Sequence, residues 1–313
     1  MIDFISKKEV DSLFAYIKTH WNKDHIFLKK MEVFNFQHNT EFDYYNFLSC
    51  KRDGKISAIL GLIDINRSAN KQIWFALWHS ISALDGYLLL NFVVNKIKPD
   101  FIGVIGISDI AKKIYKLKGF EIGILSHYYI SKPDSAFKLL NTYLLNSESN
   151  DKYDLYDNLN LETVERLSCS KFAPLKESIY YFERYVNNPF YTYQFINVYN
   201  DNILKVILIG RAVYVNDYKI FHCVDCIGDL DNVNLKKATQ KFIVENNYDV
   251  LEILFFSSDN TKIDLFLKSN NEIIPTYFSP FVFKNTDISL AYKSNNKFVR
   301  FFIGDSDQDR INA

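Results

Sequence analysis

The chain has 313 residues, of which 48% are hydrophobic and 24% are charged. This composition excludes a disordered, collagen-like or coiled-coil protein and predicts roughly two globular domains. The 37 basic residues balance the 37 acidic ones, so no overall field favours nucleic acid or an anionic membrane as a partner.

Cysteine usage and apolar stretches indicate the compartment. Four cysteines in a chain of this length are too few for a disulfide framework, which points to a reducing environment. The first residues show neither the basic start nor the apolar run of a signal peptide. The longest apolar stretches, such as residues 250–256, are far shorter than the ~20 residues needed to cross a bilayer. We expect a cytoplasmic protein without a membrane span.

The first half of the chain alternates helices and strands. Apolar residues recur at spacings of three and four over residues 7–21, which predicts an amphipathic helix. Asp53-Gly54 suits a tight hairpin between two strands, because glycine tolerates positive φ. The predicted elements are helices at 7–21 and 29–36, strands at 44–50, 56–63 and 73–78, a helix at 87–97, a strand at 101–107, a helix at 109–118 that ends at Gly119, and a closing strand at 123–130.

The second half repeats this order of elements without a detectable sequence repeat. Residues 131–160, with Pro133 and a polar run, predict a connection between domains. Beyond it we predict a helix at 180–186, strands at 193–199, 203–210 and 219–227, a helix at 233–246, a strand at 250–256, a helix at 261–269, and strands at 288–292 and 299–303. The fold class is therefore mixed α/β, with two similar units at 1–132 and 171–313 joined by residues 133–170.

The segment 108–120, S-D-I-A-K-K-I-Y-K-L-K-G-F, resembles the signature N-x-x-A-x-x-L-Y-x-x-x-G-F of GCN5-related N-acetyltransferases (GNATs). An ordinary helix with a capping glycine and a core tyrosine is the alternative. Residues 81–86 lie where that superfamily places its pyrophosphate loop, R/Q-x-x-G-x-G/A, but only Gly86 is retained, with Ile81 and Leu84 at two other motif positions. Phosphate binding there rests on backbone N–H groups at a helix start.

A narrower resemblance, over nearly the whole chain, is to two-domain bacterial acetyltransferases that modify amino sugars for surface polysaccharides. Residues 274–281 with Asn285 are similar to a P-N-Y-F-E-P-F segment of that group, and residues 301–310 are similar to D-G-D-Q-D-R-P-N. This resemblance implies transfer of acetyl from acetyl-CoA, by direct attack, to the amine of a nucleotide-linked sugar, as in lipopolysaccharide or O-antigen synthesis. A dTDP-linked amino-dideoxy sugar is the implied acceptor, bound with help from the C-terminal unit.

The superfamily resemblance also implies a cofactor site in the first unit. The backbone at Leu77 and Trp78 would polarise the thioester carbonyl, and Tyr115 would give a proton to the leaving thiolate. A core tyrosine is the alternative for Tyr115. The residues expected to bind acetyl-CoA are Leu77, Trp78, Ser82, Gly86, Tyr87, Ser108 and Tyr115.

His25 is the leading candidate for the general base, because imidazole titrates near neutral pH and His25 lies between the two front helices. In this superfamily, that region contacts the acceptor. A structural histidine and a water-mediated base remain open alternatives. The residues that compete for the role are Asp24, Glu32, His79 and His127.

The acceptor is expected to contact aromatic and acidic side chains near the C-terminus. Carboxylates accept strong hydrogen bonds from hydroxyls and attract an ammonium group, while aromatic rings stack on sugars. A solvated acidic turn, a calcium loop or packed core are the alternatives. The expected acceptor contacts are His25, Tyr277, Phe278, Asn285, Asp305 and Asp307, with Asp309 and Arg310 beside them.

No metal is expected. Cys223-Val-Asp-Cys226 has only His222 beside it, and strand alternation would point the two thiols to opposite faces. The second half also lacks phosphate-loop glycines, so we expect it to be catalytically silent.

Two other functions remain open. A tandem aminoacyl transferase of the peptidoglycan type shares the twin-unit plan, although its use of aminoacyl-tRNA would favour a basic face. A noncatalytic binding module would follow if Leu84, at a motif glycine position, had cost the chain its acetyl-CoA site.

Overall fold

The computed structural model describes residues 1–66, 71–132, 152–168, 171–215, 218–230, 233, 235–259, 267–268, 287–307 and 309. The chain divides into two compact units. The first comprises Met1–Ile122, Leu290–Asn295 and Ser306–Ala313, and the second comprises Gly123–Ser289 and Asn296–Asp305.

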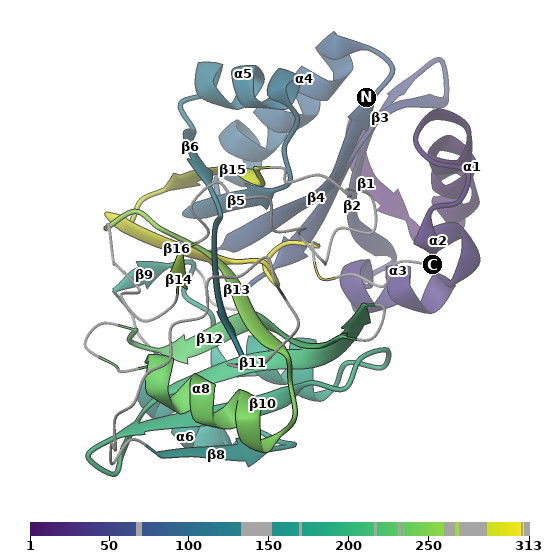
Figure 1. Cartoon of the computed structure of the whole chain (residues 1–313). Coiled ribbons are helices and arrows are strands. Elements are labelled where there is room, and N and C mark those ends of the chain that lie inside the picture. The colour runs from purple at the N-terminus through teal and green to yellow at the C-terminus, as the bar shows by residue number, and fades with distance from the viewer. Residues whose placement is uncertain are drawn as a thin grey trace. The chain divides into compact units, whose positions relative to one another are not determined.

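A seven-stranded mixed sheet forms the first unit, in the order β1-β2-β3-β4-β5-β15-β6 (Figure 1). Its strands are β1 (Ile2–Ser6), β2 (Tyr44–Arg52), β3 (Lys55–Asp64), β4 (Gln72–Ser80), β5 (Phe101–Ile105), β6 (Glu121–Ile124) and β15 (Ser289–Ser294). Its helices are α1 (Val10–His20), α2 (Ile26–Lys29), α3 (Met31–His38), α4 (Ala83–Phe92), continued by a π-helical turn at Val93–Ile97, and α5 (Asp109–Leu117).

Local sequence explains where several of these elements begin and end. Asp53 and Gly54 both take positive φ, 48° and 76°, between β2 and β3, which confirms the predicted tight hairpin. Ser108 caps α5 by accepting a hydrogen bond from the N–H of Ala111, and Gly119 follows the helix with φ 72°. The helix predicted at 109–118 is thereby confirmed.

The core on one face of this sheet lies under α4 and α5. Buried side chains of β2, β3, β4 and β5 pack there against Leu89, Leu90 and Tyr115 of the two helices. The opposite face carries α1 and α3, which contact β3. Each face of β4 therefore meets a different set of helices.

A second mixed sheet forms the other unit, in the order β14-β7-β13-β12-β11-β10-β8, with β16 pairing with β13 and β9. Its strands are β7 (Ser126–Ser131), β8 (Lys152–Tyr156), β9 (Phe172–Ala173), β10 (Gln194–Asn200), β11 (Ile203–Val215), β12 (Tyr218–Gly228), β13 (Val250–Ser257), β14 (Leu267–Lys268) and β16 (Phe298–Phe302). Its helices are α6 (Leu161–Leu167), α7 (Ser178–Tyr181), continued by a π-helical turn at Phe182–Val186, and α8 (Leu235–Glu245).

Two strands differ from the predicted division of the chain. The strand predicted at 123–130 breaks at Leu125 into β6 and β7, and β7 pairs with β13 in the second sheet. β15, predicted to close the second unit, pairs with β5 in the first sheet. Strand pairing across such long sequence separations leaves no local signature, so the pattern of apolar residues could not assign these strands to a sheet. Of the helix predicted at 261–269, only 267–268 are described, and they form β14.

The expectation that Cys223 and Cys226 point to opposite faces is wrong. Both thiols are buried in the same core cluster of the second unit. The register of β11 with β12 shifts between Ile209 and Gly210, which pair with Asp225 and Cys223, so Val224 is a bulge. One extra residue in a strand reverses the alternation beyond it.

In the part of the chain that the structure describes, no helix is long and apolar enough to cross a membrane.

Candidate functional site

The first feature of the site is a bulge in β4 at Leu77. The register of β3 with β4 passes from Gly61↔Ala76 to Ile59↔His79, so two β4 residues lie between the flanking pairs. Leu77 adopts φ 41°, a left-handed conformation that is an outlier for a bulky side chain. Such strain is held in place by surrounding structure and concentrates at functional sites.

The second feature is the divergence of β4 from β5. Their parallel pairing covers only three residue pairs and ends at Trp74↔Gly103. Gly103 permits this close approach, because a Cβ there would lie 2.2 Å from the Trp74 ring. Beyond this point β5 pairs with β15 on its other edge, and the Phe75 carbonyl of β4 accepts a hydrogen bond from Ser306 Oγ at 2.6 Å. β4 therefore offers backbone groups that β5 does not use.

The N-terminus of α4 lies against this part of β4. A Cβ at Gly86 would lie 2.6 Å from Ser80 Oγ, so the glycine lets the first turn of the helix approach the strand closely. The side chain of Ser82, the residue before the helix, makes no capping hydrogen bond. The N–H groups of Asp85 and Gly86 donate to the Ser82 carbonyl at 3.0 and 3.1 Å, and the amides that precede them at the helix start suit an anionic ligand.

An ion pair supports the same turn. The Arg52 guanidinium binds the buried carboxylate of Asp85 in a bidentate manner, with Nε 2.8 Å from Oδ2 and Nη2 2.6 Å from Oδ1. This contact lowers the pKa of Asp85 to about 2. This ion pair joins the β2–β3 hairpin to α4. It also neutralises the Asp85 carboxylate, which the N-terminus of the helix would otherwise attract. Neither member was a predicted site residue.

Trp78 and Tyr115 meet on the α4 and α5 side of the bulge. Their ring centroids are 5.3 Å apart, and Tyr115 also packs against Phe75 and Phe120. Burial raises the pKa of the Tyr115 hydroxyl, which therefore keeps its proton at neutral pH. Within the described residues, the buried Nε1 of Trp78 has no hydrogen-bond partner.

His79 lies on the other face of β4, beside α1. Nδ1 of His79 is 2.9 Å from the Tyr16 hydroxyl, which donates to the Ser57 carbonyl at 3.2 Å. The Nδ1–H tautomer of His79 satisfies both contacts, because Tyr16 can then donate to Ser57 and accept from Nδ1, and this tautomer has its lone pair on Nε2. Desolvation, with a smaller effect of His20, lowers the pKa of His79 below its ordinary value of 6.5. The imidazole is neutral at pH 7.

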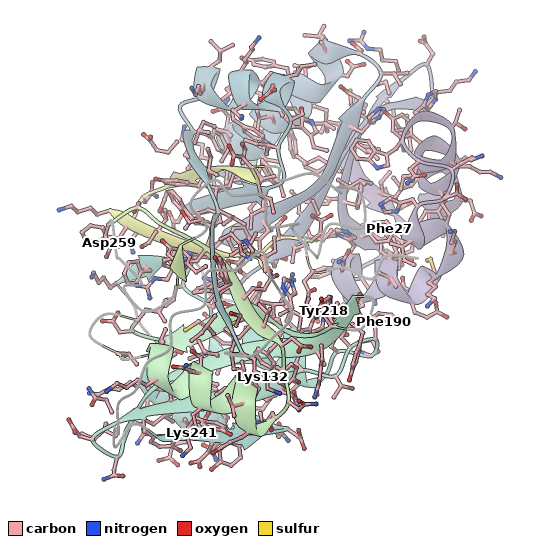
Figure 2. The ribbon with its side chains drawn as sticks, in the orientation of Figure 1. Phe27, Lys132, Phe190, Tyr218, Lys241 and Asp259 are labelled. Atoms are coloured by element: carbon pink, nitrogen blue, oxygen red, sulfur yellow. The ribbon has the colours of Figure 1, made fainter. Side chains whose placement is uncertain are left out.

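His25 has a structural contact that the sequence did not indicate. It is the residue before α2, and its Nδ1 accepts a hydrogen bond from the N–H of Phe27 at 3.3 Å. Its ring also packs edge-on against the Phe27 ring, which is labelled in Figure 2, at 4.6 Å between centroids. The lone pair of Nδ1 is therefore engaged in capping. The role of His25 as a base stays a prediction.

The other candidate bases are separated by the fold. Asp24 and Glu32 are exposed. His127 belongs to the second unit, where Nε2 lies 2.7 Å from Oε2 of Glu252, and His222 Nδ1 lies 2.9 Å from Oε1. Although burial acts to raise the pKa of Glu252, the two imidazoles hold it below its ordinary value. This cluster ties β7, β13 and β12 together.

The predicted acceptor residues are only partly described. Asp305 is buried in the second unit, 2.7 Å from the ammonium of Lys176, and burial raises its pKa to about 6 against the effect of that lysine. Asp307 is buried in the first unit. Tyr277, Phe278, Asn285 and Arg310 lie outside the described residues.

Two predicted cofactor residues have other contacts. Ser108 caps α5, as described above. Tyr87 is partly exposed, and the ammonium of Lys118 lies 4.2 Å from the centre of its ring.

The second unit also has a β-bulge beside a point where two parallel strands stop pairing. A later segment of the same unit bonds to the backbone at this bulge. Parallel pairing of β12 with β13 ends at Cys223↔Ile253, beside the Val224 bulge. β16 pairs with β13 next to it, and the Gly304 N–H donates to the Val224 carbonyl at 2.8 Å. A Cβ at Gly304 would lie 2.5 Å from that oxygen. The segment that follows β16 therefore supplies the hydrogen-bond donor for the carbonyl of the bulge residue.

Comparison with known proteins places this fold. No family model matches the chain, and no curated protein matches its sequence. Among solved structures it is similar to a GCN5-related N-acetyltransferase from Anabaena variabilis ATCC 29413, with TM-score 0.57 and 10% identity over 94% of this chain and 72% of that one. A GCN5-related N-acetyltransferase from Kribbella flavida gives 0.52 at 8% identity, over 95% and 71% of the two chains.

A conserved protein of unknown function from Enterococcus faecalis V583 is also similar, with TM-score 0.56 and 12% identity over 94% of this chain and 72% of that one. At such identities the similarity establishes the fold. The mixed sheets flanked by helices match GNAT folds, as the sequence predicted.

Proposed function

We propose that the protein is an acetyl-CoA-dependent N-acetyltransferase whose reaction takes place at the β4 bulge of the first unit. The observation that carries this proposal is the left-handed Leu77 at the point where β4 has left β5. An acyl transfer needs donors aimed at the carbonyl oxygen, and backbone released from strand pairing can supply them. The GNAT fold supports the same chemistry by analogy.

The residues present fit acetyl-CoA as the donor substrate. The uncapped first turn of α4 would bind its phosphates, and the backbone of Leu77 and Trp78 would polarise its carbonyl. The Nε1–H of Trp78, which has no partner among the residues that the structure describes, lies 3.5 Å from where a Cβ of Gly86 would be. It would serve as a further donor to the bound molecule. A buried donor without a partner is costly, which favours a ligand there.

His79 is the base that the geometry favours. An acceptor amine must lose a proton to attack, and the base needs a free lone pair at neutral pH. In the Nδ1–H tautomer, which Tyr16 stabilises, His79 has this lone pair at Nε2, whereas Nδ1 of His25 already accepts from a backbone N–H. His79 also directly follows the bulge, while His25 caps a helix.

Tyr115 is proposed as the acid. Its hydroxyl is protonated at neutral pH because burial raises its pKa, and its ring lies against Trp78 at the bulge. A tyrosine placed there would donate a proton to the thiolate as it leaves. The reaction needs no covalent intermediate on the protein.

For the acceptor we propose the amine of a nucleotide-linked sugar, with a dTDP-linked amino-dideoxy sugar as first choice. The support is the resemblance of residues 274–281 and 301–310 to acetyltransferases of surface-polysaccharide synthesis. Asp307, in the first unit with His79, is a proposed contact for it, together with Tyr277, Phe278 and Asn285. The protein would then act in the cytoplasm without a metal.

The test is incubation of the protein with acetyl-CoA and a panel of dTDP- and UDP-linked amino sugars. Free thiol release and a mass increase of one acetyl group on one sugar are expected. Thiol release with other amines alone would exclude the sugar and keep the reaction. If aminoacyl-tRNA reacts in place of acetyl-CoA, the protein is an aminoacyl transferase, and binding without any turnover would indicate a noncatalytic module.

A further inference from the structure

The second unit contains a small cavity of about 40 Å³ that the proposed reaction does not use. Two cationic side chains, Arg300 and Lys176, line it. Its remaining wall is formed by Ser168, Phe172, Pro174, Tyr181, Cys226, Gly228 and Phe302. All of these residues belong to the second unit.

Arg300, on β16, is the unusual member of this wall. Only 7% of it is exposed, and its guanidinium lies flat on the Phe172 ring, 3.6 Å from the ring centre. Its Nε and Nη2 are both buried and have no hydrogen-bond partner among the residues that the structure describes. The nearest countercharge is Asp229, with Oδ1 3.8 Å from Nη2 and a side chain that is half exposed.

Lys176, the other cation in this wall, has close countercharges. The ammonium of Lys176 lies 2.7 Å from Oδ1 of Asp225 and 2.7 Å from Oδ1 of Asp305. Tyr185 adds a hydrogen bond to Asp225 at 2.8 Å. Lys176 therefore has two carboxylates, whereas within the described part of the chain Arg300 has one distant carboxylate and no hydrogen bond along the Nε–Nη2 edge of its guanidinium.

An arginine buried in this way is unfavourable unless something binds it. Taking a charge out of water costs several kcal/mol when no hydrogen bonds replace its hydration. Stacking on Phe172 orients the guanidinium but satisfies no N–H group. Nε and Nη2 form a fork that matches the two oxygens of a carboxylate. We propose that this cavity is a carboxylate-binding site, with Arg300 as its anchor.

A larger cavity indicates the rest of the ligand. A groove of about 920 Å³ shares Ser168 with the small cavity, and Asp229, the neighbour of Gly228, lies in its wall. Amides and hydroxyls line much of it: Asn158, Asn160, Thr163, Asn197, Tyr199 and Asn202. A groove of this volume accommodates a small molecule, and its lining suits hydroxyl groups. The ligand class is therefore a polyhydroxylated carboxylic acid, such as a sugar acid.

Calorimetric titration with D-glucuronate tests the proposal, with D-glucose as the neutral counterpart. Glucuronate should bind and glucose should bind at least about ten-fold more weakly, since a charge-assisted bidentate contact is lost. Arg300→Gln should weaken glucuronate binding by a similar factor. Arg211→Gln is the matched control, because Arg211 also stacks on an aromatic ring, 4.0 Å from the centre of Tyr191, but lines neither cavity.

A measurement on the unmodified protein keeps the test valid if Arg300→Gln fails to fold. The Nε resonance of Arg300 in protein labelled with ¹⁵N-arginine should shift on addition of glucuronate and stay in place with glucose. Equal binding to wild type and Arg300→Gln, or no shift of that resonance, would overturn the site. Binding of phosphate without binding of glucuronate or acetate would overturn its assignment to a carboxylate.

Discussion

The Tyr16 hydroxyl lies 2.9 Å from Nδ1 of His79 and 3.2 Å from the Ser57 carbonyl. The tautomer of His79 that satisfies both contacts has its lone pair at Nε2, on a residue that directly follows the β4 bulge. A tyrosine of α1 thus favours one tautomer of a histidine on β4. This arrangement distinguishes His79 from His25, whose Nδ1 accepts a hydrogen bond from the N–H of Phe27.

Replacing His79 should reduce catalysis more than stability. We expect His79→Gln to lower kcat by about 100-fold or more, the usual contribution of a general base. In the wild type, kcat/KM should fall on the acid side with an apparent pKa below 6.5, because desolvation lowers the pKa of His79. The measurement is the pH dependence of kcat/KM for both proteins.

Two variants serve as controls for His79. Tyr16→Phe should retain part of the activity and change the acid limb of the pH profile of kcat/KM. The Nδ1–H tautomer of His79 loses its hydrogen bond to the Tyr16 hydroxyl in this variant. His25→Ala should lower the free energy of unfolding by about 1 kcal/mol through loss of a helix cap and leave the acid limb in place. Loss of the acid limb in His25→Ala alone would identify His25 as the base.

Tyr115→Phe should lower kcat and leave the dissociation constant of acetyl-CoA nearly unchanged. The hydroxyl is needed only as the thiolate forms, so it contributes in the transition state. Stability should change little, because the substitution keeps the ring that packs against Trp78, Phe75 and Phe120. Single-turnover kinetics and thermal unfolding separate these effects. Unchanged turnover would remove Tyr115 from the mechanism.

Trp78→Phe tests the unpartnered indole. The substitution removes Nε1–H and keeps an aromatic ring against Tyr115. Acetyl-CoA should bind roughly 5- to 10-fold more weakly, as for loss of one hydrogen bond to a ligand. The midpoint of thermal unfolding of the free protein should change less than it does for a typical core substitution. Equal affinity for acetyl-CoA in both proteins would mean that the indole faces no part of the ligand.

Stability should fall in mild acid because of His38. This residue is fully buried, Nδ1 lies 3.1 Å from the Leu62 carbonyl, and burial lowers its pKa from 6.5 to about 4. Between these values the unfolded chain binds a proton that the folded chain does not, so the free energy of unfolding decreases as the pH falls. The decrease in the free energy of unfolding reaches about 3 kcal/mol near pH 4.

The comparison with His38→Gln isolates this effect. Asp305, with a folded pKa of about 6, acts in the opposite direction over the same range, because there the folded state binds the extra proton. Urea denaturation of both proteins from pH 7 to pH 4.5 should therefore show a smaller loss for His38→Gln than for the wild type. Parallel curves would mean that His38 does not titrate in this way.

Local signals in the sequence predicted most of the individual elements. Asp53-Gly54 fixed the hairpin because two consecutive residues need positive φ, and Ser108 and Gly119 bounded α5 through capping. β1, at residues 2–6, was missed because its single fully buried side chain gives no alternating pattern. The mixed α/β order of elements in both halves of the chain followed from these local patterns.

Features that depend on distant residues could not be predicted. The placement of β7 and β15 in opposite sheets is set by pairing with β13 and β5. The Val224 bulge, which puts Cys223 and Cys226 in one core, has no sequence signature. In the candidate site, Gly86 was identified as a phosphate-loop remnant, but its observed role is to let α4 approach Ser80. The contact of Tyr16 with His79 joins residues 63 positions apart.

Titration of the protein with acetyl-CoA in a calorimeter tests the central claim most directly. The open β4 bulge of the first unit and the filled bulge of the second, where Gly304 binds the Val224 carbonyl, predict one site per chain. Binding with a stoichiometry of one, weakened by Trp78→Phe, is the expected result. Absence of binding would contradict the account of the β4 bulge, and two sites per chain would contradict the account of the second unit.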